Sequence, residues 1–397
     1  MKDYNMHEYR YLIIGGGMTA GAAVHGIRQI DPSGGIGIIS DDSYPPYNRP
    51  PLSKALWKGE PLEKIWGGMD MGDCEIHLSR TVKSIDSKSK RVVDDGGEVY
   101  AYGKLLLATG VRVRRLPWDV DGIMYFRTLD DYQQLRLQTG RGQAFVIIGG
   151  GFIGSEIAAA LAMNRKSVAM IFPEDGIGAR MYPPALVRFL NTFYQSKGVD
   201  IYPRTGIAGI EKRESQFVVK TTTGKELKVD GVVAGIGVQP NQELAGSAGL
   251  SVGNGVLVDE FLRTTDQDIY AAGDVANFYN PALGERTRVE HEDNAIAMGN
   301  TAGRNMVGGS TAYHHLPFFY SDLFELGFEA VGQLDSRLEM VQDWKVEFRE
   351  GVVYYVNEGR VRGVLLWNTW GQVEAARALI AEKGPFTAQN LKQRLPA

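Results

Sequence analysis

Two glycine-rich turns, each between an apolar strand and a helix of small residues, constrain the fold of this chain more than any other feature. The first reads Gly15-Gly16-Gly17-Met18-Thr19-Ala20, and the second reads Gly149-Gly150-Gly151-Phe152-Ile153-Gly154. A turn of this kind, placed after a strand and before a helix, holds the pyrophosphate of one dinucleotide. Two such turns therefore predict two bound dinucleotides, and electron transfer between them.

The first turn has the residue types that its geometry needs. Gly15 permits the tight bend, Gly17 lets the pyrophosphate approach the main chain, and Ala20 allows close packing of helix and strand. The helix start offers free N–H groups and a partial positive charge to the phosphates. A carboxylate after the second strand should bind the ribose hydroxyls, and Asp41 occupies that place.

The second turn carries the complete pattern of Gly149, Gly151 and Gly154. Glu174 follows the next predicted strand and is the candidate acid for the ribose, which favours NADH as the cofactor. Arg180 lies six residues further on and could instead bind the 2′-phosphate of NADPH. The sequence therefore predicts NADH as the cofactor, and NADPH is the alternative that Arg180 leaves open.

Composition excludes several other classes of protein. The 397 residues are enough for two or three domains, and the net charge of −4, without a long basic stretch, argues against nucleic-acid binding. No apolar run approaches the ~20 residues of a membrane span, and residues 1–10 are polar, so we expect a cytoplasmic protein. Cys74 is the only cysteine, which excludes a dithiol relay. The six scattered histidines predict no metal site.

The pattern of apolar runs predicts an α/β fold with two Rossmann-like dinucleotide-binding domains and a separate C-terminal α+β domain. The first dinucleotide-binding domain is expected at 1–118 and 243–313, the second at 119–242, and the C-terminal domain at 314–397. Strands are expected at 10–14, 36–40, 81–86, 91–94, 99–102, 105–108, 144–148, 167–172, 231–237, 352–356 and 363–367, and helices at 18–30, 152–164 and 373–382.

Two further segments carry charged residues of interest. Arg49 and Lys54 lie among four prolines at 45, 46, 50 and 51, which favour a fixed conformation over a solvated loop. A fixed cation near a flavin would stabilise negative charge on the reduced ring. Glu290 and His291 are adjacent and could equally form a surface turn, as could His314-His315.

At these residues the chain resembles the FAD- and NAD(P)H-dependent pyridine nucleotide oxidoreductases, most of all the apoptosis-inducing-factor branch and its bacterial relatives. Ferredoxin and rubredoxin reductases and monodehydroascorbate reductase are related to that branch. The resemblance covers about residues 10–382. It implies a glutathione-reductase-like architecture in which 1–118 and 243–313 bind FAD, 119–242 bind NAD(H), and 314–397 form an interface or dimerisation domain. It rests on motifs at 47–57, 107–110, 172–174, 237–241, 272–274, 278–279, 289–291, 319–322 and 364–368.

The resemblance implies roles for individual residues. Lys54 and Glu156 would pair near flavin N5 and, with His291, act as the catalytic residues. Non-covalent FAD would be bound by Gly15, Gly17, Ala20, Asp41, Arg49, Lys54, Val82, Ala108, Thr109, Gly110, Arg127, Asp274, Glu290, His291 and Tyr320. NADH would be bound by Gly149, Gly151, Phe152, Ile153, Gly154, Glu156, Glu174, Arg180 and Gly237.

The sequence also departs from the family. Tyr320 stands where the apoptosis-inducing factors have Trp before Ser-Asp, which keeps an aromatic face and adds a hydroxyl. No cysteine lies between Asp41 and Lys54, so the disulfide reductases of the family are excluded.

The resemblance implies hydride transfer from NADH to flavin N5, followed by electron transfer to an external acceptor. That acceptor could be a ferredoxin-type protein, a quinone or another small molecule. The alternative is an NADH-responsive redox sensor with weak oxidase activity, in which NADH binding alters homodimer formation.

Overall fold

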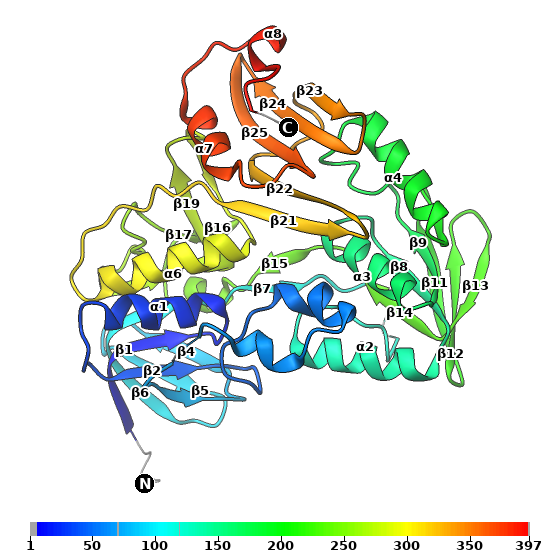
Figure 1. The fold of residues 1–397 in the computed structure, drawn as a ribbon. Helices are drawn as coiled ribbons and strands as arrows, with labels where there is room; N and C mark the ends of the chain where they lie inside the picture. Colours follow the sequence, from blue (N-terminus) through cyan, green and yellow to red (C-terminus); the bar gives the residue numbers. More distant parts are fainter. Residues whose placement is uncertain (1–5, 70, 119, 396–397) are drawn as a thin grey trace. The chain divides into compact units, whose positions relative to one another are not determined.

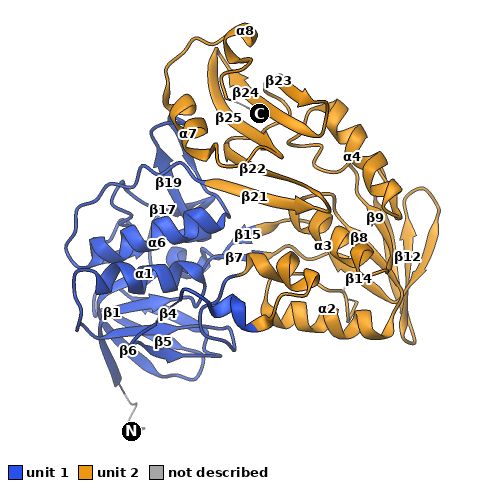
Figure 2. Ribbon diagram, in the orientation of Figure 1, with its two compact units in different colours: residues 1–48, 63–112, 239–317 blue, residues 49–62, 113–238, 318–397 orange. Residues whose placement is uncertain are grey.

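The computed structural model describes residues 6–69, 71–118 and 120–395, and these form two compact units (Figure 2). Unit 1 comprises residues up to 48, 63–112 and 239–317, and unit 2 comprises 49–62, 113–238 and 318 onward. The three predicted domains stay a prediction, and their bounds at 1, 119 and 397 lie outside the described residues. None of the described helices is long and apolar enough to cross a membrane.

Unit 1 is built on a seven-stranded sheet in which β3, β2, β1 and β6 are parallel neighbours, and β5 and β4 extend it antiparallel from β6. β18 also pairs in parallel with β6, so the chain returns to this sheet late in the sequence, as predicted. The strands of the sheet are β1 (Met6–Ile14), β2 (Ile36–Ile39), β3 (Glu75–His77), β4 (Val82–Asp86), β5 (Arg91–Asp94), β6 (Val99–Leu107) and β18 (Ile269–Ala271).

Two helices, α1 (Met18–Arg28) and α6 (Glu292–Met306), lie side by side in unit 1 and form part of its apolar core (Figure 1). Leu12, Ile13 and Ile14 of β1 are all buried, which explains the uninterrupted apolar run of a strand covered on both faces. The remaining elements of the unit are α5 (Glu243–Ser247), β16 (Val252–Gly253), β17 (Gly255–Leu257), η4 (Gly273–Val275), β19 (Ala276–Asn280) and β20 (Glu285–Thr287).

Unit 2 contains a second parallel sheet, in the order β10-β9-β8-β14, and its helix α3 packs on β8 and β9. A small antiparallel sheet, β11-β12-β13, accompanies it. The elements are α2 (Leu129–Arg141), β8 (Ala144–Ile148), α3 (Phe152–Met163), β9 (Ser167–Ile171), α4 (Pro184–Ser196), β10 (Val199–Tyr202), β11 (Ile207–Arg213), β12 (Gln216–Thr221), β13 (Glu226–Val229) and β14 (Gly231–Ala234).

The last part of unit 2 is an antiparallel sheet of five strands in the order β21-β22-β25-β24-β23, with α7 packed on β22 and β25 (Figure 1). Its elements are β21 (Phe318–Leu323), β22 (Leu326–Gly332), β23 (Glu339–Val346), β24 (Glu350–Asn357), β25 (Arg360–Trp367), α7 (Val373–Ala381) and α8 (Ala388–Leu391). The predicted fold class, with two dinucleotide-type sheets and a C-terminal α+β part, is confirmed.

Short elements complete the chain. The proline-rich segment of unit 2 folds into two 3₁₀ turns, η1 (Pro50–Ser53) and η2 (Ala55–Lys58). The elements at junctions between segments of the two units are η3 (Leu62–Trp66), β7 (Val111–Val113) and β15 (Val238–Pro240).

Candidate dinucleotide sites and a buried ion pair

The first glycine turn has the backbone that the sequence predicts. Gly15 has a φ of +113°, and a Cβ there would lie 2.1 Å from the carbonyl oxygen of Ala108, so only glycine fits. Gly17 is the N-cap of α1 and provides no side chain to cap it. The N–H groups at the start of this 11-residue helix therefore have no side-chain cap, as an anion site requires.

Other predicted FAD residues of unit 1 lie at the ends of strands or in the segments that connect them. Asp41 is exposed just after β2, and Val82 is the first residue of β4. Thr109 and Gly110 are fixed by Asn241, whose side-chain amide donates to the Thr109 carbonyl at 2.8 Å and whose N–H donates to the Gly110 carbonyl at 3.0 Å. Asn241 belongs to the predicted motif at 237–241, but its contact with Thr109 and Gly110 could not be predicted, because the two segments are far apart along the chain.

Asp274, Glu290 and His291 belong to unit 1 as well. Asp274 lies in η4, directly after β18, and His291 is the N-cap residue of α6. Burial lowers the pKa of the His291 imidazole to about 4, although the charge of Asp274 acts in the opposite direction. The ring is therefore neutral at pH 7. Glu290 forms an ion pair with Arg288 at 2.8 Å.

The second glycine turn, in unit 2, repeats the geometry of the first. Gly149 has a φ of +111°, and a Cβ there would lie 2.3 Å from the carbonyl oxygen of Gly235. A Cβ on Gly154 would lie 2.1 Å from the Gly149 carbonyl oxygen, which shows how closely α3 approaches the strand end. A Cβ on Gly151 would meet no atom within 4 Å, and α3 has no side-chain cap. Space and N–H donors for a pyrophosphate thus occur together at the start of α3.

The residues predicted around this turn are placed as follows. Glu174 follows β9 and accepts a hydrogen bond from Arg180 at 2.5 Å, so the two candidates for cofactor discrimination form an ion pair. Gly237 has a φ of +95° before β15, and its carbonyl accepts from the Arg114 N–H at 2.9 Å. Arg127, which is predicted to bind FAD rather than NADH, also belongs to unit 2; it precedes α2 and donates its main-chain N–H to Asp131 at 2.9 Å.

A buried ion pair lies between η1 and α3 of unit 2. Lys54 Nζ is 2.8 Å from Glu156 Oε1, and the two side chains are 12% and 2% exposed. Glu156 also accepts hydrogen bonds from Ser53 to Oε2 and from Ser321 to Oε1, both at 2.6 Å. Three donors satisfy this carboxylate, as a buried charge requires.

The family resemblance predicts the pairing of Lys54 with Glu156, but neither serine is among the predicted site residues. Ser53 directly precedes Lys54 in the proline-rich motif, which could have drawn attention to it. Ser321 comes from β21, and no spacing in the sequence relates it to α3. The fold of unit 2 is what brings η1, α3 and β21 together on one carboxylate.

Aromatic side chains border the ion pair. Lys54 Nζ lies 5.2 Å from the centre of the Tyr320 ring, a cation–π distance. Phe152 meets Phe319 edge-on, with ring centres 5.2 Å apart. The structure therefore groups Lys54, Glu156 and Tyr320 within unit 2.

Two other predicted residues lie at the starts of neighbouring elements. Arg49 directly precedes η1, and Ile153 is 37% exposed at the start of α3.

A comparison with protein-family models matches residues 9–299 to the pyridine nucleotide-disulphide oxidoreductases. The mitochondrion-associated C-terminal domain of apoptosis-inducing factor matches residues 302–346 and 341–382. The chain belongs to the pyridine nucleotide-disulphide oxidoreductase family. It is an NAD(P)H-dependent flavoprotein oxidoreductase of the ferredoxin-reductase and apoptosis-inducing-factor type, and this membership implies FAD and NAD(P)H as cofactors.

The similarity to individual relatives extends over most of their length and most of this chain. The chain is 32% identical to apoptosis-inducing factor 1 of Dictyostelium discoideum, over 99% of this chain and 81% of that protein. It is 34% identical to a rubredoxin-NAD(+) reductase of Pseudomonas putida, over 83% and 88%. The putidaredoxin reductase solved as a covalent complex with putidaredoxin superposes with a TM-score of 0.87, at 28% identity, over 96% of this chain and 94% of that one.

Proposed function

We propose that this flavoprotein oxidises NADH and delivers the electrons to a ferredoxin-type protein. The observation that carries the proposal is the second glycine turn, where Gly151 leaves open space before an uncapped helix and Glu174 follows the next strand. This combination suits the pyrophosphate and the ribose of NADH. Bound FAD supplies the ring that accepts a hydride from the nicotinamide and passes electrons on to the acceptor.

The turn of unit 1 would hold the FAD pyrophosphate, with Asp41 at the ribose. The other side chains and backbone segments proposed for FAD are those named from the sequence, namely Arg49, Lys54, Val82, Ala108, Thr109, Gly110, Arg127, Asp274, Glu290, His291 and Tyr320. What supports them is the close approach of the Gly15 turn to Ala108 and the fixed crossover at Thr109 and Gly110.

Lys54 and Glu156 are proposed to act on the flavin. A lysine held at 2.8 Å from a buried carboxylate keeps its cation in one place, which suits it to stabilise negative charge nearby. Ser53 and Ser321 hold the carboxylate and so act as positioning residues for Lys54. His291, neutral at pH 7, can hydrogen-bond without adding a second charge.

The preference for NADH rests on Glu174. A carboxylate at this place accepts hydrogen bonds from the ribose hydroxyls and repels a 2′-phosphate. Arg180 neutralises part of that charge, because it is bound to Glu174 at 2.5 Å. Anaerobic stopped-flow reduction of the flavin tests the point: NADH should reduce it faster than NADPH, and Glu174→Gln should narrow the difference. Faster reduction of the wild type by NADPH would contradict the proposal.

The choice of a ferredoxin-type acceptor is supported by the relatives. They include the ferredoxin reductase subunit of a 5,5'-dehydrodivanillate O-demethylase of Sphingobium, at 32% identity. Steady-state NADH turnover should be faster with a ferredoxin than with oxygen or a quinone, and it should fall as salt screens the contact between the two proteins. Equal turnover with oxygen alone would contradict this choice.

A second candidate function is an NADH-responsive redox sensor. The observation that favours it is the match of the C-terminal segment to the corresponding domain of apoptosis-inducing factor. A sensor of this kind should change its sedimentation coefficient when NADH is added, through formation or loss of a homodimer. A reductase should keep the same sedimentation coefficient when NADH is added.

A further inference from the structure

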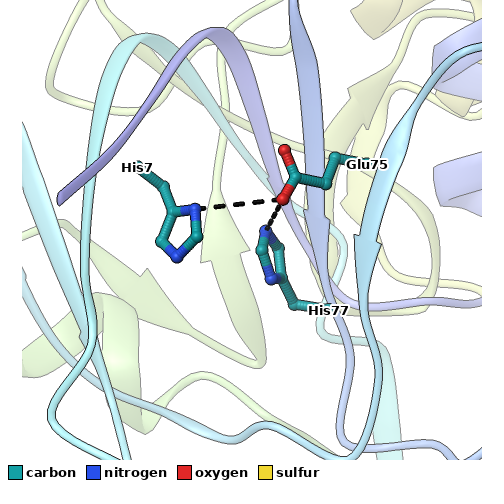
Figure 3. Close-up of side chains that lie close together, drawn as sticks. All are labelled: His7, Glu75 and His77. Atoms are coloured by element: carbon teal, nitrogen blue, oxygen red, sulfur yellow. Dashed lines mark ion pairs between the residues drawn. The ribbon is translucent and has the colours of Figure 1, made fainter. Parts of the chain in front are cut away.

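Two histidines and a glutamate converge in unit 1 at a place that the proposed function does not use (Figure 3). His7 lies near the start of β1, and Glu75 and His77 are the first and last residues of β3. Glu75 Oε1 lies 3.9 Å from His7 Nδ1 and 3.6 Å from His77 Nε2. The donor atoms of the three residues all lie within 4.8 Å of one another.

These distances are close to those of a metal site. Two ligands of a tetrahedral zinc ion, with bonds of about 2.0–2.1 Å, are about 3.4 Å apart. The two distances from Glu75 Oε1, 3.9 and 3.6 Å, exceed this value by only about half an ångström or less. Two imidazoles and one carboxylate are also a donor set that zinc accepts, with water in the fourth position. The Glu75 side chain is 58% exposed, so water can reach that position.

The two imidazole rings are held in place by aromatic neighbours. Tyr100 stacks on His7, with ring centres 5.1 Å apart, and meets His77 edge-on at 5.0 Å. The Tyr100 hydroxyl donates to Asp94 at 2.9 Å, which fixes the orientation of the Tyr100 ring. The Tyr9 hydroxyl is 2.7 Å from His77 Nε2, the nitrogen that faces Glu75, so this contact occupies the ligand atom and does not orient the ring. Ordered rings lose little freedom on binding an ion, and neighbours that orient the ligands are usual at metal sites.

We infer that His7, Glu75 and His77 form a binding site for one divalent transition-metal ion of the zinc class. The ion joins the start of β1 to β3. Binding of the ion requires the Tyr9 hydroxyl to give up its contact with His77 Nε2. Imidazole and carboxylate ligands together suit Zn²⁺ and its first-row neighbours rather than Ca²⁺ or Mg²⁺. The site is independent of the dinucleotide chemistry.

The test is a titration of the FAD-loaded protein with Zn²⁺ by calorimetry, after treatment with EDTA and dialysis. Co²⁺ serves as a spectroscopic probe of the coordination. The wild type should bind one ion per chain. His7→Gln and Glu75→Gln should each weaken binding by at least about tenfold, because each removes a ligand. Both side chains are partly exposed, so the fold should tolerate these changes.

His25→Gln is the matched control, because His25 is an exposed histidine of the same unit whose only described partner is Gln29. It should leave both Zn²⁺ affinity and stoichiometry unchanged. The inference is contradicted if the wild type shows no saturable binding. It is equally contradicted if Glu75→Gln and His7→Gln bind as tightly as the wild type, or if His25→Gln binds as weakly as they do.

Discussion

Replacing Lys54 by Met should destabilise the protein by about 3–5 kcal/mol, because it leaves the Glu156 carboxylate as a buried charge without its cation. The side chains are 12% and 2% exposed, and their charged atoms are 2.8 Å apart. At an effective dielectric constant of about 20, the attraction at this distance is of the order of 6 kcal/mol before the cost of desolvation. The two serine hydroxyls remain, and they compensate only part of the loss.

The interaction free energy between Lys54 and Glu156 can be measured with a double-mutant cycle. Glu156→Gln alone should cost less, about 2–3 kcal/mol, because Lys54 is partly exposed and can turn toward water. The double variant Lys54→Met/Glu156→Gln should be more stable than the sum of the single effects predicts, by at least about 2 kcal/mol. Urea unfolding at pH 7 with saturating FAD, followed by circular dichroism, measures all four proteins.

A second ion pair provides the matched control. Lys58 and Asp322 come from the same two segments as Lys54 and Ser321, and their charged atoms are also 2.8 Å apart, but the side chains are 44% and 35% exposed. Lys58→Met should therefore cost no more than about 1 kcal/mol. The reasoning is refuted if the coupling between Lys54 and Glu156 lies within about 0.5 kcal/mol of zero, or if Lys58→Met costs as much as Lys54→Met.

Three further predictions follow from single contacts. Ser321→Ala removes one donor from the buried carboxylate and should cost about 1.5–3 kcal/mol in urea unfolding. Gly151→Ala should keep the fold but raise the KM for NADH about tenfold or more. Gly149→Ala should instead destabilise the fold itself, because its Cβ would lie 2.3 Å from a carbonyl oxygen. Equal stability of the two variants in urea unfolding would contradict this difference. The pKa of His291, lowered to about 4, predicts that the free energy of unfolding falls by up to about 3 kcal/mol as the pH drops from about 6.5 to 4, because only the unfolded state takes up the proton. The variant His291→Asn should lack this pH-dependent loss of stability. Identical pH profiles of the unfolding free energy for the wild type and His291→Asn would contradict the prediction.

The sequence predicts what local geometry determines. The two glycine turns are readable because Gly15 and Gly149 need positive φ, and because each turn follows a buried apolar strand. The strand over Ala144–Ile148 has the bounds predicted for it. Helix starts at Met18 and Phe152 were also correct, since each follows directly from its glycine turn.

Errors arise where pairing across the chain decides the structure. The sequence predicts two strands at 99–102 and 105–108, but these segments form most of the single strand β6, which continues through Gly103. A Cβ on Gly103 would lie 2.8 Å from the Arg10 carbonyl oxygen, so this glycine marks a close approach to β1 rather than a break. β1 likewise begins at Met6 rather than Arg10, because its first residues pair with β6.

The same limit applies to the candidate sites. Ser321 and Glu156 are brought together only by the packing of β21 on α3. The scattered histidines of the sequence predict no metal site, and nothing in the spacing of His7 and His77 relates them. Their side chains come together because β1 and β3 belong to one sheet and both rings contact Tyr100.

Electron transfer from NADH to bound FAD is tested most directly by mixing the purified protein with NADH under anaerobic conditions and following the visible absorbance of the flavin. We expect a yellow protein with one non-covalent FAD per chain, whose flavin absorbance bleaches rapidly on mixing with NADH and returns when an oxidised ferredoxin is added. A colourless protein that does not retain added FAD, or a bound flavin that NADH does not reduce, would contradict electron transfer from NADH to FAD in this chain.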